Sequence, residues 1–171
     1  RQAEILAANK EDLKAAKENG MSEAMLDRLA LTPARIEGMA KGVEDVSAQR
    51  DPVGRILSGE TNPKGLKVEK ITVPMGVIGI IYEARPNVTS DAAALCLMAG
   101  SAVILRGGKE AFRSNNAIAE VLRNAIESAD LPRDSVQLVQ DTSRASSVEL
   151  MGMTEYLDLL IPRGGAGLIR A

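Results

Sequence analysis

The chain has 171 residues, and its 21 basic and 23 acidic side chains give a formal net charge of −2 at pH 7. Apolar residues make up 45% and charged residues 26%, fractions typical of globular proteins, which excludes an intrinsically disordered chain. Aromatic residues make up only 2%, and like charges do not cluster. We therefore expect neither a nucleic-acid partner, which requires basic patches or aromatic stacking, nor a membrane-surface partner.

The first 50 residues are predicted to be helical. Asn19-Gly20 ends a first helix, because glycine commonly follows the last helical turn. Ser22 is expected to cap a second helix, and Thr32-Pro33 opens a third one, with proline in the first turn where it is tolerated. The third helix has one apolar face, formed by Ile36, Met39, Ala40, Val43 and Val46.

Residues 51–73 link this helical part to the rest. Residues 51–65 contain Asp-Pro, Ser-Gly and Asn-Pro pairs, which predict a loop. Residues 67–73 are predicted to form an edge strand that Pro74 ends.

From residue 74 onward, short apolar runs alternate with helical segments. Strands are predicted at residues 77–82, 102–105, 135–139 and 157–161, and helices at 91–98, 115–128, 146–151 and from Gly164 onward. This alternation predicts an α/β fold with a doubly wound, mostly parallel, Rossmann-like sheet. Right-handed crossovers would bring the carboxyl ends of all strands to one edge, where ligands bind in such folds.

Four turns from strand to helix should line that edge, at residues 83–87, 106–109, 140–144 and 162–165. Glycine lets backbone N–H groups approach a phosphate closely, and lysine or arginine adds a direct charge. Together these turns predict an anionic ligand, most simply a dinucleotide. The Gly-x-Gly-x-x-Gly fingerprint is absent, so the alternative of ordinary turn glycines stays open.

The chain contains no histidine, and Cys96 is its single cysteine. Neither a metal site nor an internal disulfide is expected, and a reducing compartment, the cytoplasm, is the simplest location. Cys96 lies in an apolar helix without a nearby cation or base, which predicts a buried core thiol rather than a nucleophile. The chain also lacks an apolar run of about 18 residues, so no membrane span is expected.

Three runs of the chain resemble those of γ-glutamyl phosphate reductases: Val73–Thr89 (VPMGVIGIIYEARPNVT), Ala102–Ala111 (AVILRGGKEA) and Leu159–Gly165 (LLIPRGG). The resemblance extends in order over essentially the whole chain. It implies an aldehyde dehydrogenase fold and, as the activity, NADPH-dependent reduction of γ-glutamyl phosphate to glutamate 5-semialdehyde and phosphate in proline biosynthesis.

In that family the reaction proceeds through a cysteine thioester, and the reactive cysteine lies in a separate catalytic domain. Both ends of the chain have a helical pattern, so we expect a truncated chain that stops before this cysteine and is inactive alone. The resemblance thus implies an incomplete NADP-binding domain over residues 1–171, with helices in 1–50, the loop and edge strand in 51–73 and βα units in 74–171. A homo-oligomer is expected at full length.

The resemblance assigns cofactor contacts to Arg106, Gly107, Gly108, Lys109, Arg163, Gly164 and Gly165. Lys109 stands where many NAD-using aldehyde dehydrogenases have a glutamate for the adenosine ribose, and a lysine there would meet the 2′-phosphate of NADP. Arg106 would contact the adenosine ribose or phosphate, and the Arg163–Gly165 backbone the pyrophosphate or nicotinamide ribose. The alternative is a solvated side chain for Lys109, a surface salt bridge for Arg106 and tight strand–helix packing for Arg163–Gly165.

Asn87 matches the oxyanion-hole asparagine of aldehyde dehydrogenases, and its alternative is a turn or N-cap residue. Arg85 is assigned to the acyl phosphate or the substrate carboxylate, with an ion pair to Glu83 or Asp91 as the alternative. At the level of the whole chain, the alternative is a non-catalytic nucleotide-binding or assembly module.

Overall fold

The computed structural model describes residues 1–169, and its first part consists of the predicted helices. These are α1 (Gln2–Glu18), α2 (Glu23–Leu29) and α3 (Pro33–Ser47). The Thr32 hydroxyl accepts a hydrogen bond from the Arg35 backbone N–H at 3.1 Å and so caps α3 as predicted. Ser22 occupies the N-cap position of α2, but its side chain makes no capping hydrogen bond to the described residues.

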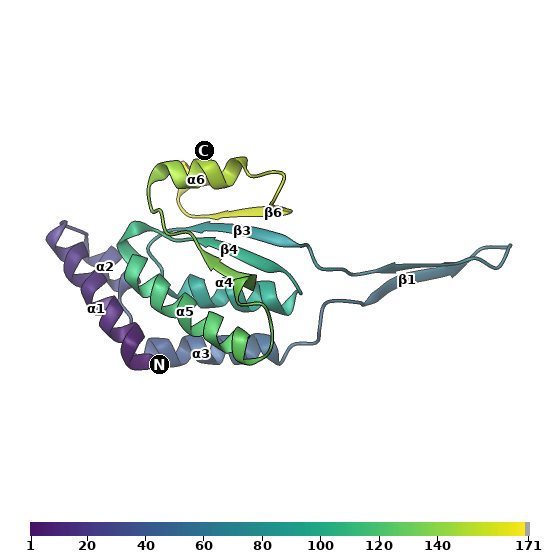
Figure 1. Cartoon of the computed structure of the whole chain (residues 1–171), viewed down its shortest axis with the longest axis horizontal. Helices are drawn as coiled ribbons and strands as arrows, with labels where there is room; N and C mark the ends of the chain where they lie inside the picture. The colour runs from purple at the N-terminus through teal and green to yellow at the C-terminus, as the bar shows by residue number, and fades with distance from the viewer. Residues whose placement is uncertain (170–171) are drawn as a thin grey trace.

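The second part is a parallel sheet of four strands within residues 1–169, in the order β5-β4-β3-β6. The strands are β3 (Val77–Tyr82), β4 (Ala102–Arg106), β5 (Val136–Leu138) and β6 (Leu159–Arg163). The connecting helices α4 (Asn87–Met98) and α5 (Phe112–Ser128) cover one face, and α6 (Arg144–Gly152) lies on the other face (Figure 1). Short helical turns η1 (Lys109–Ala111) and η2 (Arg133–Ser135) precede α5 and β5, and α7 (Ala166–Ile169) follows β6. The predicted α/β fold is confirmed.

The main core lies between the sheet and helices α4 and α5. Strand β3 contributes Ile78, Ile80 and Tyr82, each at most 6% exposed, which explains its continuous apolar sequence. Cys96 belongs to the same core, and its burial raises the pKa of the thiol. The predicted core thiol is therefore confirmed.

The N-terminal helices form an outer layer over α4 and α5. Ile5 of α1, Ile36 of α3 and Ile118 of α5 form one small apolar cluster. The Asp12 carboxylate of α1 accepts hydrogen bonds from the backbone N–H and the hydroxyl of Ser114, both at 2.7 Å. Helix α1 is therefore attached to the body by both apolar and polar contacts.

The predicted loop at residues 51–65 is wrong. Residues Ile56–Thr61 form strand β1, which pairs antiparallel with β2 (Lys67–Ile71) in a hairpin that projects from the body (Figure 1). Asn62 forms the turn, because its side-chain oxygen accepts from the backbone N–H groups of Lys64 and Leu66 at 3.0 and 2.9 Å. The Asn-Pro pair thus lies in a hairpin turn instead of breaking the strand pattern.

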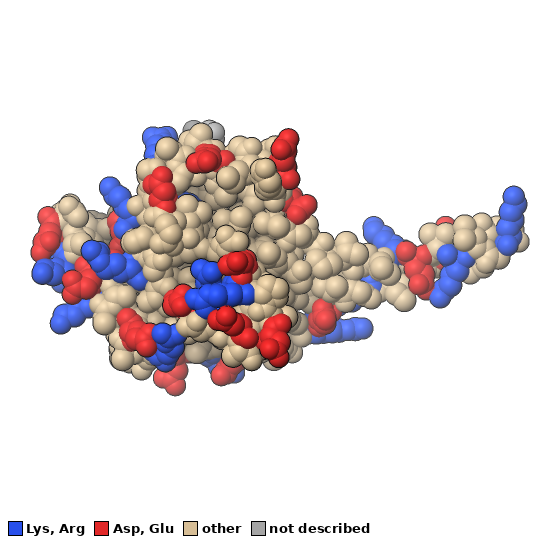
Figure 2. Space-filling model, in the orientation of Figure 1, with Lys and Arg blue, Asp and Glu red and all other residues tan. Residues whose placement is uncertain are grey.

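The predicted edge strand also needs correction. Within residues 1–169, β2 pairs with β1 in a separate sheet and not with the parallel sheet. Every residue of both hairpin strands is exposed, and Figure 2 shows charges of both signs along this arm. A strand-forming sequence alone does not indicate which sheet the strand joins.

The strand order places a topological switch point between β3 and β6. The chain runs from β3 through β4 to β5 and then returns to the other side of β3. Ligands of open α/β sheets bind at such points, beyond the carboxyl ends of the strands. Among residues 1–169, no helix combines the length and the apolar character needed to cross a bilayer.

Candidate functional site

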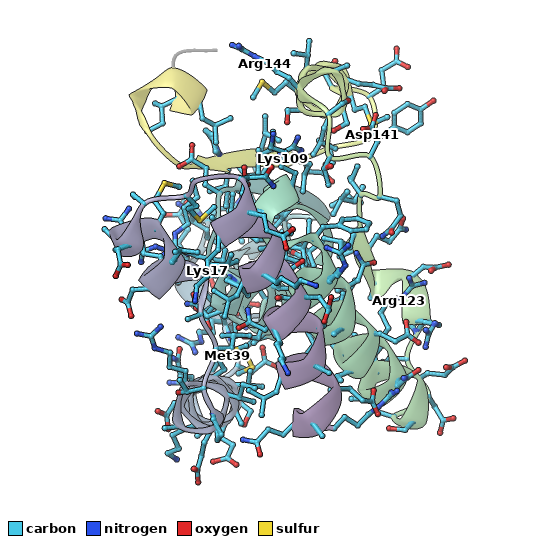
Figure 3. The ribbon with its side chains drawn as sticks, turned by 90° about the vertical axis from the view of Figure 1, so that its left-hand side faces the viewer. Lys17, Met39, Lys109, Arg123, Asp141 and Arg144 are labelled. Atoms are coloured by element: carbon cyan, nitrogen blue, oxygen red, sulfur yellow. The ribbon has the colours of Figure 1, made fainter. Side chains whose placement is uncertain are left out.

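Figure 3 looks onto the edge of the sheet where the parallel strands end, with Lys109 lying between the N-terminal helices and α6. Three adjoining hollows open here. The β4 hollow, about 600 Å³, lies between the ends of β3 and β4 and helix α6. The glycine hollow, about 460 Å³, lies beside the β3 and β6 ends. The α2–α4 hollow, about 600 Å³, lies between α2, α3 and the start of α4.

The β4 hollow contains most of the predicted cofactor residues of the second turn. Arg106, Gly108 and Lys109 line it together with Thr142, Ser143 and Arg144 from the third predicted turn. Lys109 is exposed, and its ammonium group makes no ion pair or hydrogen bond with residues 1–169. An unpaired cation of this kind can accept an anionic ligand without breaking an existing contact.

Arg106 lines the β4 hollow and is also engaged with the turn before α6. Its guanidinium donates to the backbone carbonyls of Thr142 and Ser143 at 2.8 and 2.7 Å and so fixes the turn before α6. In the same turn Asp141 accepts hydrogen bonds from the N–H and hydroxyl of Ser143, and these bonds, aided by the charge of Arg106, lower the pKa of Asp141. The alternative of a surface salt bridge for Arg106 is wrong for the described residues.

Gly107 and Gly108 are both buried. A Cβ on Gly107 would collide with the Asn115 amide, whose oxygen accepts a hydrogen bond from the Thr89 hydroxyl at 3.1 Å. A Cβ on Gly108 would lie 2.8 Å from a carboxylate oxygen of Glu110. Close packing therefore explains Gly107, whereas the Glu110 side chain could move away from a Cβ at position 108. Gly108 also lines the β4 hollow.

The last predicted turn lines the glycine hollow. Arg163, Gly164 and Gly165 lie there beside Glu83, and the Gly165 backbone N–H donates to a Glu83 carboxylate oxygen at 3.4 Å. A Cβ on Gly164 would lie 2.9 Å from the Glu83 side chain. Because Glu83 also lines the β4 hollow, the predicted residues converge on one edge but are divided between neighbouring hollows.

Asn87 and Arg85 line the α2–α4 hollow, and Arg85 also lines the glycine hollow. Asn87 is the first residue of α4, and its amide N–H donates to the Asp91 carboxylate at 3.0 Å. Pro86 holds the N-cap position, so the N-cap alternative for Asn87 is wrong. Arg85 forms no ion pair with Glu83, Asp91 or any other residue in 1–169, so that alternative is wrong as well.

Sequence reasoning did not assign Arg144 and Arg28 to the site. Arg144 is the last residue of the third predicted turn, so its position after a strand was an available signal. Arg28 lies on α2, far from the sheet in sequence, and only the tertiary packing brings it to the edge. Within residues 1–169, no group of three or more His, Cys, Asp or Glu side chains is placed to hold a metal ion.

A scan of protein-family models found no match. Among curated proteins, the chain is 58% identical over 168 residues to a γ-glutamyl phosphate reductase of Clostridium beijerinckii, covering 98% of this chain and 41% of that protein. The crystal structure of the γ-glutamyl phosphate reductase from Thermotoga maritima matches 99% of this chain and 41% of that one, with a TM-score of 0.98 and 44% identity. The predicted resemblance is confirmed, and the chain spans about two fifths of the length of these relatives.

Two more distant structures share the fold. An acetylating aldehyde dehydrogenase from Geobacillus thermoglucosidasius matches 98% of this chain and 41% of that one with a TM-score of 0.58 at 17% identity. An engineered glycolyl-CoA reductase with bound NADP⁺ matches 97% of this chain and 43% of that one with a TM-score of 0.61, also at 17% identity. The expected aldehyde dehydrogenase-like fold is thereby confirmed.

Proposed function

We propose that this chain is the cofactor-binding part of a γ-glutamyl phosphate reductase and that residues 1–171 form an incomplete NADP-binding domain. The complete enzyme reduces γ-glutamyl phosphate to glutamate 5-semialdehyde in proline biosynthesis. In this reaction NADPH supplies a hydride, the bond between the acyl carbon and the phosphate oxygen breaks, a C–H bond forms and phosphate leaves. The similarity to γ-glutamyl phosphate reductases over 98% of the chain supports this proposal.

The observation that carries the cofactor assignment is the unpaired Lys109 in the β4 hollow. Its ammonium group is a suitable partner for the 2′-phosphate of NADP, because a lysine binds phosphate as a compact charge. Arg106 contributes a positive charge beside it while it holds the turn before α6. The β4 hollow is then the place for the adenosine end of the cofactor, with Gly108 in its lining.

The other end of the cofactor is assigned to the glycine hollow. Arg163, Gly164 and Gly165 follow β6 at the switch point, where backbone groups commonly approach a pyrophosphate. A phosphate oxygen there would compete with the Glu83 carboxylate for the Gly165 backbone N–H. The nicotinamide ribose would then lie near Arg85 and the start of α4.

The reacting carbonyl is assigned to the α2–α4 hollow. The Asn87 side chain would donate to the oxygen on which negative charge develops, which is a large stabilising contribution in acyl chemistry. Arg85 would bind an anionic group of the substrate. Cys96 is buried in the core and lines none of the three hollows among the described residues, so it does not serve as the nucleophile.

The main alternative is a module that binds a nucleotide without converting it, or one that serves assembly. The exposed hairpin of β1 and β2 favours an assembly role, because it projects from the body with both strands unburied. The glycine- and cation-lined hollows at the switch point favour a nucleotide site instead.

The test combines binding and turnover. NADPH and NADH are titrated against the chain, and binding is followed by fluorescence. Turnover of γ-glutamyl phosphate is measured for a full-length enzyme, in which this chain is followed by the further residues that complete its curated relatives. We expect the chain to bind NADPH more tightly than NADH without turnover, and the full-length enzyme to reduce γ-glutamyl phosphate with NADPH. A correctly folded full-length enzyme that binds NADPH but leaves γ-glutamyl phosphate unreduced would identify a non-catalytic module.

We also propose a cytoplasmic enzyme that acts as a homo-oligomer at full length. The single buried cysteine fits a reducing compartment, and the apolar residues exposed on the hairpin, among them Leu57 and Val68, fit a subunit contact. Sedimentation of the full-length enzyme and cell fractionation are the measurements that check these two statements.

A further inference from the structure

The α2–α4 hollow holds a set of charges that the cofactor assignment does not use. It has a volume of about 600 Å³ and is lined by three arginines and two aspartates: Arg28, Arg35, Arg85, Asp27 and Asp91. The volume suits a small metabolite. Arg28 and Arg85 also line the glycine hollow, so both guanidinium groups lie where the two hollows meet.

Two of these five charges neutralise each other. The Arg35 guanidinium donates to the Asp27 carboxylate at 2.7 Å and to the Ala30 carbonyl at 2.9 Å. This ion pair joins α2 to the start of α3 and leaves little net charge at that side of the hollow.

The other three charges have no oppositely charged partner among residues 1–169. Within residues 1–169, the side chains of Arg28 and Arg85 make neither a hydrogen bond nor an ion pair. The Asp91 carboxylate accepts one hydrogen bond, from the neutral amide of Asn87 at 3.0 Å, and forms no ion pair with the described residues. The hollow therefore presents two free guanidinium groups and one carboxylate to a ligand.

This pattern is complementary to a zwitterion. Guanidinium groups bind a carboxylate through paired N–H donors, and an aspartate binds an ammonium group. We propose that the α2–α4 hollow recognises the α-amino-acid end of the substrate, with Arg28 and Arg85 holding the α-carboxylate and Asp91 holding the α-ammonium group. The proposal rests on the proposed function and assigns Arg28 and Asp91 as specificity residues.

The position of Asn87 supports this orientation. Asn87 lines the same hollow and contacts Asp91 directly, while the glycine hollow continues on the other side of Arg85. A substrate held by its amino-acid end thus extends its γ-carbonyl toward Asn87 and the expected nicotinamide position. Without these contacts, an aldehyde of the same length would lack a fixed orientation.

The test uses the full-length enzyme in the reverse direction, in which an aldehyde, phosphate and NADP⁺ give the acyl phosphate and NADPH. The variants are Arg28→Gln and Asp91→Asn, and the matched control is Arg50→Gln, an exposed arginine outside the three hollows. The aldehydes are glutamate 5-semialdehyde and butanal, which lacks both α-groups. Binding of L-glutamine, which carries the same zwitterionic end and a neutral γ-carboxamide, is measured as inhibition.

We expect Arg28→Gln to lower kcat/KM for glutamate 5-semialdehyde at least about tenfold, because a hydrogen bond between charged groups is lost. Inhibition by L-glutamine should weaken by a similar factor, while kcat/KM for butanal and the KM values for phosphate and NADP⁺ stay unchanged. Asp91→Asn should act in the same direction, since its amide oxygen still accepts from Asn87 but carries no charge. Arg50→Gln should match the unmodified enzyme in every parameter.

Three results for Arg28→Gln would overturn the proposal. The first is a rise in the KM for phosphate with the KM for the aldehyde unchanged, which would assign Arg28 to the phosphoryl group. The others are an equal loss of kcat/KM for butanal, or kinetic parameters equal to those of Arg50→Gln. An unmodified enzyme that binds NADP⁺ but oxidises neither aldehyde would refute the proposed function itself, and this inference with it. Circular dichroism and NADP⁺ affinity of each variant separate these outcomes from misfolding.

Discussion

Lys109 and Arg106 lie three positions apart at the end of β4, yet they are available for different tasks. The Arg106 guanidinium is engaged with the carbonyls of Thr142 and Ser143, whereas the Lys109 ammonium has no partner in residues 1–169. A cation without an internal partner can pair with a charged group of a ligand. The preference for NADPH over NADH should therefore depend on Lys109.

We therefore expect Lys109→Glu in the full-length enzyme to lower the ratio of kcat/KM for NADPH to that for NADH about tenfold or more. The physical reason is that an attractive charge at the 2′-phosphate becomes a repulsive one. Steady-state kinetics with both cofactors measure the ratio. Lys17→Glu, another exposed lysine in Figure 3 that lies outside the β4 hollow, is the control, and an unchanged ratio for Lys109→Glu would remove the assignment.

Asn87 gives a second prediction at the scale of the residue. Asn87→Ala should lower kcat of the full-length enzyme about a hundredfold, because one donor to the developing oxyanion is lost. NADPH affinity, measured by fluorescence titration, should be retained. A kcat within a few-fold of the unmodified enzyme would instead limit Asn87 to holding Asp91.

At the scale of the element, α1 is fixed to α5 by a buried carboxylate. Asp12 is 2% exposed and accepts hydrogen bonds from the backbone N–H and the hydroxyl of Ser114. Asp12→Ala would leave these two donors buried without a partner, which costs about 2–4 kcal/mol of the free energy of unfolding. Denaturant unfolding of the chain measures this loss.

The control for this prediction is Asp45→Ala. Asp45 forms an exposed ion pair with Lys41 at 3.0 Å on α3, and such pairs contribute little to the free energy of unfolding. If Asp12→Ala and Asp45→Ala lose equal stability, the attachment of α1 depends on its apolar contacts and not on Asp12.

The first residue of α4 could not be predicted from the sequence pattern. The helix was predicted from residue 91, but it begins at Asn87. Its first turn contains Thr89 and Ser90, which are weak helix formers, and both are buried. The Thr89 hydroxyl hydrogen-bonds to Tyr82 and Asn115 at 2.7 and 3.1 Å, so contacts from β3 and α5 stabilise a turn that local propensity does not predict.

At the scale of the whole molecule, the N-terminal helices complete the site. Helix α2 provides Arg28 to two of the three hollows at the carboxyl edge of the sheet, although about 50 positions separate it from β3. The region predicted to consist only of helices therefore contributes to the candidate site as directly as the βα units do. The hairpin of β1 and β2 extends away from this edge (Figure 1).

Features that depend on neighbouring residues could be predicted from the amino-acid sequence. Apolar runs of strand length between helical segments fixed the α/β class, and the residues that follow each strand, such as Gly108, Lys109 and Gly164, had to lie at the carboxyl edge of a parallel sheet. Three further features could be read from the folded chain alone: β2 pairs with β1, Arg106 holds the turn before α6, and Arg28 reaches the edge of the sheet. These features depend on contacts with residues that are tens of positions away in the chain. The local sequence around a charged residue or a strand does not predict which distant group it will contact.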